Sequence, residues 1–225
     1  MTTLAVALIS VAGTLGGTLG GAVPSQRASR AEAREQNRRV DRQQEQEQEQ
    51  EQEQEQERAE QAVQAKRDLY ARLNTTARAY RIAGRDVVEA VARGETLDPA
   101  LLDAAKEAWA EHYSQAQMTL ASDLLEVASS LNRALGIGYS VVKQLPSSSD
   151  HEAAYRRAAA WFKGPLSDGV YLLRVALRQD LGVESEAEFE QWRLQMVTAL
   201  DRARDALAQQ LETERRQANA SVDQP

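Results

Sequence analysis

The chain has 225 residues, a net charge of −7, two histidines and no cysteine. The absence of cysteine excludes disulfides and thiolate chemistry. An acidic chain has no broad basic field for nucleic acid, so we expect no nucleic-acid partner. Ala, Leu, Glu, Gln and Arg dominate, and Gly and Pro are few after residue 24. This mixture favours helix over strand and predicts an all-α protein.

The first apolar segment is LAVALISVAGTLGGTLGGAV, from Leu4 to Val23, and it contains no charged residue. A helix of this length spans about 30 Å, which is the hydrocarbon thickness of a bilayer. We therefore predict a transmembrane anchor over residues 1–24. One alternative is a secretory signal peptide, although no basic residue precedes the run and Ala22-Val23-Pro24 is a poor cleavage site. The other is a buried core helix.

A cluster of arginines follows the apolar segment, and no Lys or Arg precedes it. By the positive-inside rule, this asymmetry predicts an N-terminus outside the cell and residues 25–225 in the cytoplasm. The predicted location is the inner (plasma) membrane, crossed once. The cluster either only sets this topology, which is the simpler interpretation, or also binds anionic lipid headgroups. Its members are Arg27, Arg30, Arg34, Arg38, Arg39 and Arg42.

Glycines recur at a spacing of four within the predicted anchor. Overlapping G-x-x-x-G patterns leave a smooth strip along which a second membrane helix approaches closely, so they predict self-association of the anchor. The alternative is that glycine is simply common in membrane helices. The residues predicted to pack in the membrane are Gly13, Gly16, Gly17, Gly20 and Gly21.

The low-complexity tract QQEQEQEQEQEQEQER runs from Gln43 to Arg58 and contains no apolar residue, so it has no coiled-coil seam. Gln and Glu are good helix formers, but glutamates four residues apart repel each other. We predict that residues 25–58 form a polar spacer, a solvated helix that frays easily and reaches about 50 Å. The alternative is a repeat without fixed structure.

Residues 59–215 carry amphipathic stripes separated by helix breakers, which predicts an antiparallel bundle of four to five helices. The first stripe resembles a coiled-coil seam and ends at Arg93-Gly94. Asp98-Pro99 begins the next helix, which weakens between Met118 and Ser122, and Pro146 ends the helix that follows. The three stripes are Tyr70, Leu73, Ala77, Tyr80, Gly84, Val87 and Val91; Leu102, Ala105, Trp109, His112 and Ala116; and Leu124, Ala128, Leu131, Leu135, Tyr139 and Val142.

The C-terminal part of the bundle has its own caps and breaks. Ser149 with Glu152 and Ser185 with Glu188 each form a predicted capping box. Gly164-Pro165 interrupts one helix, Gly182 ends the next, and residues 216–225 form a polar, mobile tail. The apolar stripes are Tyr155, Ala158, Trp161 and Phe162; Leu166, Val170, Leu173 and Leu177; and Phe189, Trp192, Met196, Ala199, Ala203 and Leu207, reaching toward Leu211.

The search for catalytic, cofactor-binding or metal-ligating residues gives none. The histidines His112 and His151 are far apart in the sequence, and neither belongs to an H-E-x-x-H or E-x-x-H pair. No Ser has a plausible His and acid partner. We predict a protein that is not an enzyme and has no cofactor. We interpret His112 as a core or edge histidine with a hydrogen-bond partner, and not as a ligand or base. The aromatics of RRAAAWFKG, Arg156 to Gly164, are interpreted as core residues beside a solvated face.

Two segments carry a resemblance to known proteins. YARLNTTARAYRIAGRDVVEAV, from Tyr70 to Val91, and LLRVALRQDLGV, from Leu172 to Val183, resemble segments of uncharacterised actinobacterial proteins with a single-pass anchor and a helical body. Small membrane proteins of actinomycete mobile elements share this style. The resemblance implies an anchored helical protein and brings no activity with it.

These predictions lead to three hypotheses of different classes. The first is a membrane-anchored cytoplasmic interaction or scaffold module that contacts membrane lipids and binds a protein partner. The second is a membrane effector or transport accessory that acts through oligomers of its anchor. A third hypothesis is an unrecognised enzyme, which a polar pocket around His112 with a strongly shifted carboxylate would favour.

Overall fold

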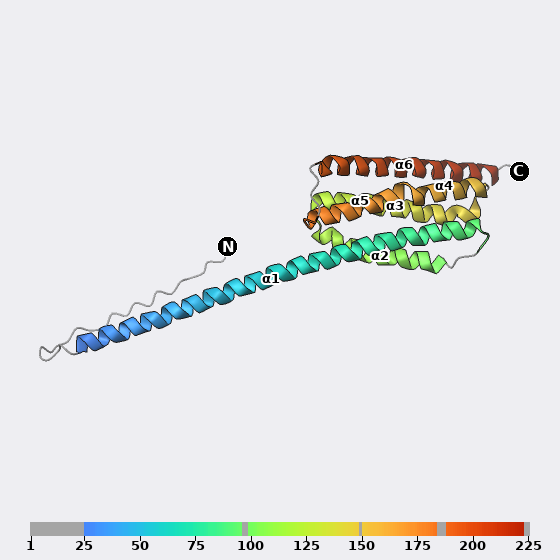
Figure 1. The fold of residues 1–225 in the computed structure, drawn as a ribbon. Helices are drawn as coiled ribbons and strands as arrows, with labels where there is room; N and C mark the ends of the chain where they lie inside the picture. Colours follow the sequence, from blue (N-terminus) through green and yellow to red (C-terminus); the bar gives the residue numbers. More distant parts are fainter. Residues whose placement is uncertain (1–24, 96–98, 149, 184–187, 223–225) are drawn as a thin grey trace, which may run out of the picture. The chain divides into compact units, whose positions relative to one another are not determined.

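The computed structural model describes residues 25–95, 99–148, 150–183 and 188–222, and within these ranges it contains helices and no strand (Figure 1). The prediction of an all-α protein is confirmed. The helices are α1 (Ser25–Ala92), α2 (Pro99–Thr119), α3 (Ser122–Gln144), a 3-10 turn at Leu145–Ser147, α4 (His151–Lys163), α5 (Pro165–Asp180) and α6 (Phe189–Val222).

The chain divides into two compact units, residues 1–59 and residues 60–225. Of the first unit, the structure describes the N-terminal part of α1, which covers the predicted spacer, and every side chain that it describes there is exposed. Among the helices that the structure describes, none has a stretch long and apolar enough to cross a membrane. The predicted anchor over residues 1–24 lies outside the described residues.

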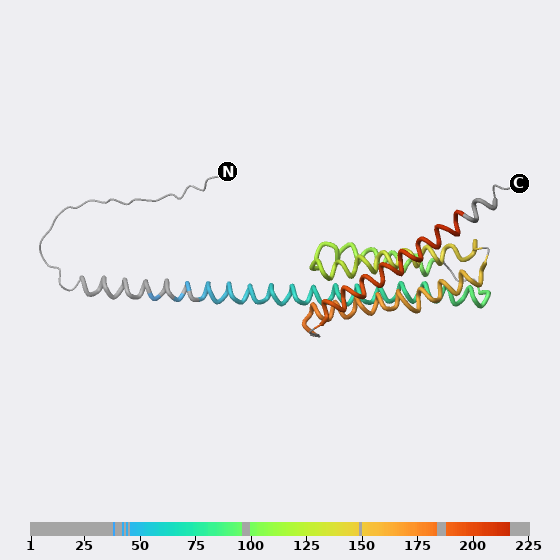
Figure 2. Tube along the Cα trace, turned by 90° about the horizontal axis from the view of Figure 1, so that it is seen from above, coloured from blue at the N-terminus to red at the C-terminus, as the bar shows by residue number. Residues whose placement is uncertain are grey.

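The second unit is a helical bundle in which each pass runs opposite to the one before it. In α1, Tyr70 contacts Asp180 while Arg81 contacts Phe162, so α1 is antiparallel to the pass formed by α4 and α5. Trp109 bonded to Asn132 and Tyr113 bonded to Ser129 give the same relation between α2 and α3. The passes therefore alternate in direction from α1 to α6 (Figures 1 and 2).

The ends of the helices follow the predicted signals at several points. Gly94 and Gly182 have φ angles of 72° and 69° and terminate α1 and α5. In both, the next amide bonds a carbonyl five residues back, as in a Schellman motif. Pro165 opens α5, and Gly164 separates it from α4, so one pass of the bundle consists of two helices. This break explains why six α-helices occupy five passes.

Three predictions about helix ends need correction or fall outside the described residues. The N-cap of α4 is Asp150, whose Oδ1 accepts from the amide of Ala153 at 2.9 Å; the predicted capping Ser149 is not described. The capping pair at Ser185 is likewise outside the described ranges. The C-terminal tail is not irregular up to Val222, because α6 continues to that residue.

The core forms from the predicted stripes with two shifts. The stripe of α1 is buried from Tyr70 to Gly84, but its last residue Val91 is exposed, and Val88 and Ala90 are buried instead. In α6, the predicted Ala199 is exposed, and Val197 and Leu200 lie in the core. The largest fully buried side chains are Trp109, Phe162, Leu73, Leu102, Leu131, Leu135, Leu166, Leu172 and Leu173.

The ring of Phe162 packs against two glycines from different helices. A methyl group on Gly84 of α1 would lie 2.3 Å from Cε1 of Phe162, and one on Gly138 of α3 would lie 3.2 Å from Cζ. Glycine at these two positions therefore lets α1 and α3 approach the aromatic end of α4, where the break at Gly164 begins.

Candidate functional site

The predicted membrane-packing residues Gly13, Gly16, Gly17, Gly20 and Gly21 lie outside the described residues. The backbone of the predicted arginine cluster, Arg27, Arg30, Arg34, Arg38, Arg39 and Arg42, lies in α1. Of its side chains the structure describes those of Arg38 and Arg42, and both are exposed. Nε of Arg42 donates to the carbonyl oxygen of Arg38 at 3.1 Å, a contact within the helix that leaves most of the guanidinium donors facing solvent.

A polar cluster joins α1 to the end of α5. The hydroxyl of Tyr70 donates to Oδ2 of Asp180 at 2.5 Å, and Nζ of Lys66 lies 2.6 Å from the same oxygen. Burial and the hydrogen bond to Asp180 raise the pKa of Tyr70 above its ordinary value. Burial opposes ionisation of Asp180, but the hydrogen bonds from Lys66 and Tyr70 outweigh it and lower its pKa. The charged carboxylate is therefore the form that the bundle stabilises.

A second polar cluster lies between α2 and α3. Tyr139 donates to Oδ1 of Asp103 at 2.8 Å, and Lys143 lies 3.3 Å from the same carboxylate. Nζ of Lys106 lies 4.3 Å from the centroid of the Tyr139 ring, a cation–π contact. The hydrogen bond from Tyr139, followed by that from Lys143, lowers the pKa of Asp103. Behind this cluster, burial raises the pKa of the Tyr80 hydroxyl.

Helix α6 is held on α3 by charged groups in addition to its apolar side. Arg193 is 5% exposed and bonds Glu126 of α3 at 2.6 Å, Glu190 in its own helix at 3.0 Å, and the carbonyl of Asp123 at 3.3 Å. Burial opposes the charge on Arg193, but its two glutamates more than compensate and raise its pKa. Glu126 contacts Arg193 and, further along both helices, Ser130 donates to Asp201 at 2.8 Å. Helices α3 and α6 therefore run parallel.

The segment RRAAAWFKG behaves as the sequence predicts. Trp161 and Phe162 are buried in the core. Arg157 forms a bidentate ion pair with Glu214 of α6, at 2.5 and 2.8 Å, and Lys163 lies 3.7 Å from Glu89 of α1. Arg157 and Lys163 thus pair with neighbouring helices, and Arg156 lies 3.8 Å from Glu152 of α4 itself, so the basic side chains do not form a separate basic patch.

His112 is partly buried on the inner face of α2, as predicted, but the hydrogen-bond partner expected for its buried ring nitrogen is not found among the described residues. Its Nδ1 is buried and has no hydrogen-bond partner in the part of the chain that the structure describes. Over the same ranges, no group of three or more His, Asp or Glu side chains is placed to hold a metal ion. The carboxylates with lowered pKa lie elsewhere: Asp103 and Asp180 are each held by a tyrosine and a lysine, and Glu95 is held by Arg93.

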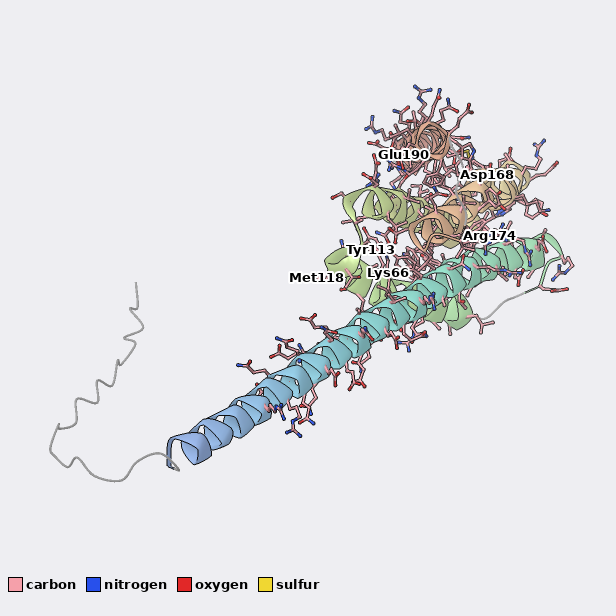
Figure 3. All side chains as sticks on the ribbon, turned by 60° about the vertical axis from the view of Figure 1, so that its left-hand side comes forward. Lys66, Tyr113, Met118, Asp168, Arg174 and Glu190 are labelled. Carbon is pink, nitrogen blue, oxygen red and sulfur yellow. The ribbon has the colours of Figure 1, made fainter. Side chains whose placement is uncertain are left out.

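The sequence patterns missed an aromatic group on the surface. Tyr171 is 49% exposed on α5, and its ring stands edge-on to Trp192 at 6.1 Å. The guanidinium of Arg174, a residue labelled in Figure 3, lies 4.9 Å from the centroid of the Tyr171 ring. Tyrosine, tryptophan and arginine are the side chains that most often dominate protein interfaces. The sequence could have indicated this group, because Tyr171 lies outside the predicted apolar stripe of its helix.

Comparison of the chain with models of known protein families, with curated proteins and with solved structures gives no match.

Proposed function

We propose that this protein is a non-enzymatic, single-pass membrane protein whose cytoplasmic helical bundle is an interaction or scaffold module. The observation that carries the proposal is the pairing of an uncharged segment, Leu4 to Val23, with an arginine cluster on its C-terminal side alone. A span of this length with one-sided basic flanks favours insertion with the N-terminus outside.

The chemistry of the bundle supports a binding role. The clusters around Asp180, Asp103 and Arg193 each contain a side-chain bond to a neighbouring helix, so these groups fix how the helices pack. A general acid or base needs a proton acceptor or donor facing a substrate, whereas these carboxylates face tyrosine, lysine and arginine. Rigid helices that present exposed aromatic and charged side chains suit recognition of another protein.

Topology is the direct test. Full-length protein fused at its C-terminus to a fluorescent protein that folds only in the cytoplasm is expected to fluoresce. The same fusion to alkaline phosphatase, which is active only outside, is expected to be silent. The protein is expected to stay in the membrane pellet after carbonate extraction. An active phosphatase fusion, or intact protein in the carbonate supernatant, would show that the proposal is wrong.

A charged variant of the segment gives a matched control. Val11→Asp together with Leu15→Asp places two carboxylates near the middle of the span, each costing about 2.5–3.5 kcal/mol in a membrane helix. This variant is expected to leave the membrane pellet. The conservative pair Val11→Leu and Leu15→Val keeps the segment apolar and is expected to remain there.

The G-x-x-x-G spacings favour a second candidate, in which the protein is a membrane effector or transport accessory that acts through oligomers of its anchor. Replacing Gly16, Gly17 and Gly20 by Leu keeps the segment apolar and removes the smooth strip. Loss of self-association in membranes together with loss of the cellular phenotype would favour this candidate, whereas an unchanged phenotype would remove it.

A further inference from the structure

The N-terminal part of α1 carries its charge in two blocks of equal length. Residues 27–42 hold six Arg against three acidic residues, a net charge of +3, and residues 43–58 hold seven Glu against one Arg, a net charge of −6. Every described side chain from Arg38 to Asp68 is exposed. Most helices in proteins are stabilised by the packing of an apolar face. This part of α1 is polar on all sides and has no such face, so another contact must stabilise it.

The helical register places most of the arginines on one side of α1, and some of the glutamates continue that side. Successive steps of three and four residues place these arginines and glutamates within a broad band that covers one half of the helix circumference, while the remaining glutamates of the tract lie on the other half. The first half of the band is basic and the second half is acidic, and Glu35 and Asp41 are the acidic residues within the basic half. We name this band the charged stripe; it consists of Arg27, Arg30, Arg34, Arg38, Arg42, Glu45, Glu49, Glu53 and Glu57.

A stripe with this block pattern is complementary to itself in one orientation. When two copies lie antiparallel with Arg42 of one facing Glu45 of the other, Arg30 faces Glu57 and Arg38 faces Glu49. Parallel copies in register place arginine against arginine and glutamate against glutamate, which repel. The same feature therefore favours one mode of self-association and opposes the other.

We propose that the charged stripe is an interface between two copies of this chain, which pair antiparallel along the N-terminal part of α1. Such a contact is isologous, because the same surface serves both copies. Each exposed ion pair contributes little, so the contact depends on many pairs acting together and is weakened by salt.

The stripe interface does not rest on the membrane anchor, since its charges lie wholly within residues 27–57. Where both copies are anchored in one membrane, an antiparallel pair must lie along the bilayer surface, with its two anchors about 55 Å apart. Parallel association of anchors through their glycines would bring like blocks together. The two modes therefore exclude each other along this segment.

Cysteine cross-linking of the full-length chain tests the orientation, because the native sequence has no cysteine. Ala31 and Gln56 both belong to the side of α1 that bears the stripe and lie at similar distances from its centre. Protein carrying Ala31→Cys is mixed with protein carrying Gln56→Cys in a neutral detergent at low salt and then oxidised. We expect the mixed disulfide to form in clear excess over either self-linked product, and its yield to fall about tenfold in roughly 0.5 M NaCl.

Charge reversal separates this interface from a non-specific contact. Replacing Glu45, Glu49, Glu53 and Glu57 by Lys changes the second block from −6 to +2, and replacing Arg27, Arg34 and Arg38 by Glu changes the first block from +3 to −3. Each variant alone is expected to lose the cross-link. A mixture of the two variants places opposite charges together again and is expected to regain it.

Three outcomes would overturn the proposal. Self-linked Ala31→Cys as the main product would show parallel pairing. Failure of the mixed charge variants to recover the cross-link would show that charge complementarity does not direct the contact. If no mixed product forms, and trypsin cleavage at the arginines slows only when phosphatidylglycerol vesicles are added, the occupant is anionic lipid. Carbonate extraction reports on the anchor independently, so failure of this proposal and failure of the membrane proposal are distinguishable.

Discussion

Phe162 shows how single residues set the distance between helices. Its ring fills the space that a side chain on Gly84 would need, and the clash at 2.3 Å involves a ring that is fully buried and has little room to move. We expect Gly84→Ala to destabilise the bundle by about 1–3 kcal/mol through overpacking. The matched control is Gly136→Ala on α3, which meets no atom within 4 Å and is expected to stabilise by about 0.5–1 kcal/mol. Urea unfolding of both variants measures the difference; equal effects would contradict it.

Asp180 makes the stability of the bundle sensitive to acid. Its pKa is lower in the folded chain than in the unfolded chain, so its contribution is present above the unfolded pKa and is lost as the pH falls through the folded one. Asp180→Asn is therefore expected to flatten the loss of stability between about pH 5 and pH 2. Thermal unfolding across this range measures it, with Asp205→Asn on the outer surface of α6 as control. If the stability of Asp180→Asn falls with pH as steeply as that of the native chain, the contribution assigned to Asp180 is wrong.

At the residue scale, the sequence predicted burial better than it predicted partners. Tyr70 was expected in the core from its place on an apolar stripe, and it is buried. Its hydroxyl bonds Asp180, 110 positions away in the sequence, and nothing in the local pattern of either residue indicates that pair. The pairing depends on the axial alignment of α1 and α5, which the packing of the whole bundle determines.

Among the helices, α6 shows how a pattern of apolar residues alone can predict the wrong side of a helix as buried. The buried positions of α6 include Phe189, Arg193, Val197 and Leu200. Because Arg193 occupies one of them, a stripe drawn only through apolar residues moves to Trp192 and then to the exposed Ala199. The breaks at Pro146, Gly164 and Gly182 were predictable because backbone chemistry at Pro and Gly acts locally.

The buried arginine also provides a prediction for the docking of α6. Arg193→Ala removes the contacts to Glu126, Glu190 and the carbonyl of Asp123, and leaves a void where the side chain lay. We expect a loss of about 1–3 kcal/mol, because charged hydrogen bonds near the core are broken while the two glutamates remain partly solvated. The control is Arg216→Ala, whose exposed pair with Glu212 is worth about 0–0.5 kcal/mol.

Urea unfolding of the two arginine variants gives the comparison. If Arg193→Ala lowers the free energy of unfolding by no more than Arg216→Ala does, apolar packing alone holds α6 on the bundle. A double variant with Glu126→Ala isolates the cross-helix pair, because any coupling beyond the sum of the single effects belongs to that contact.

Across the whole molecule, charge and apolar surface are distributed in opposite ways. The residues of the hydrophobic core begin at Leu69, and the contacts between helices of the bundle begin at Lys66. The segment before them carries the dense charge blocks and no described buried side chain. The boundary between the spacer and the bundle was predictable from this change in composition. The orientation that we propose for self-association depends on the helical register, and therefore on the continuity of α1 from Ser25 to Ala92.

This division predicts that the Gln/Glu tract can be removed without loss of stability in the bundle. Deleting residues 44–57 takes out no core residue and no cross-helix contact of the second unit. Urea unfolding, followed by the fluorescence of the core tryptophans Trp109 and Trp161, is expected to give a free energy within about 0.5 kcal/mol of the full chain, the range for changes away from packed sites. A loss above about 1 kcal/mol would show that the tract supports the bundle directly, and it would contradict the separation of the two units.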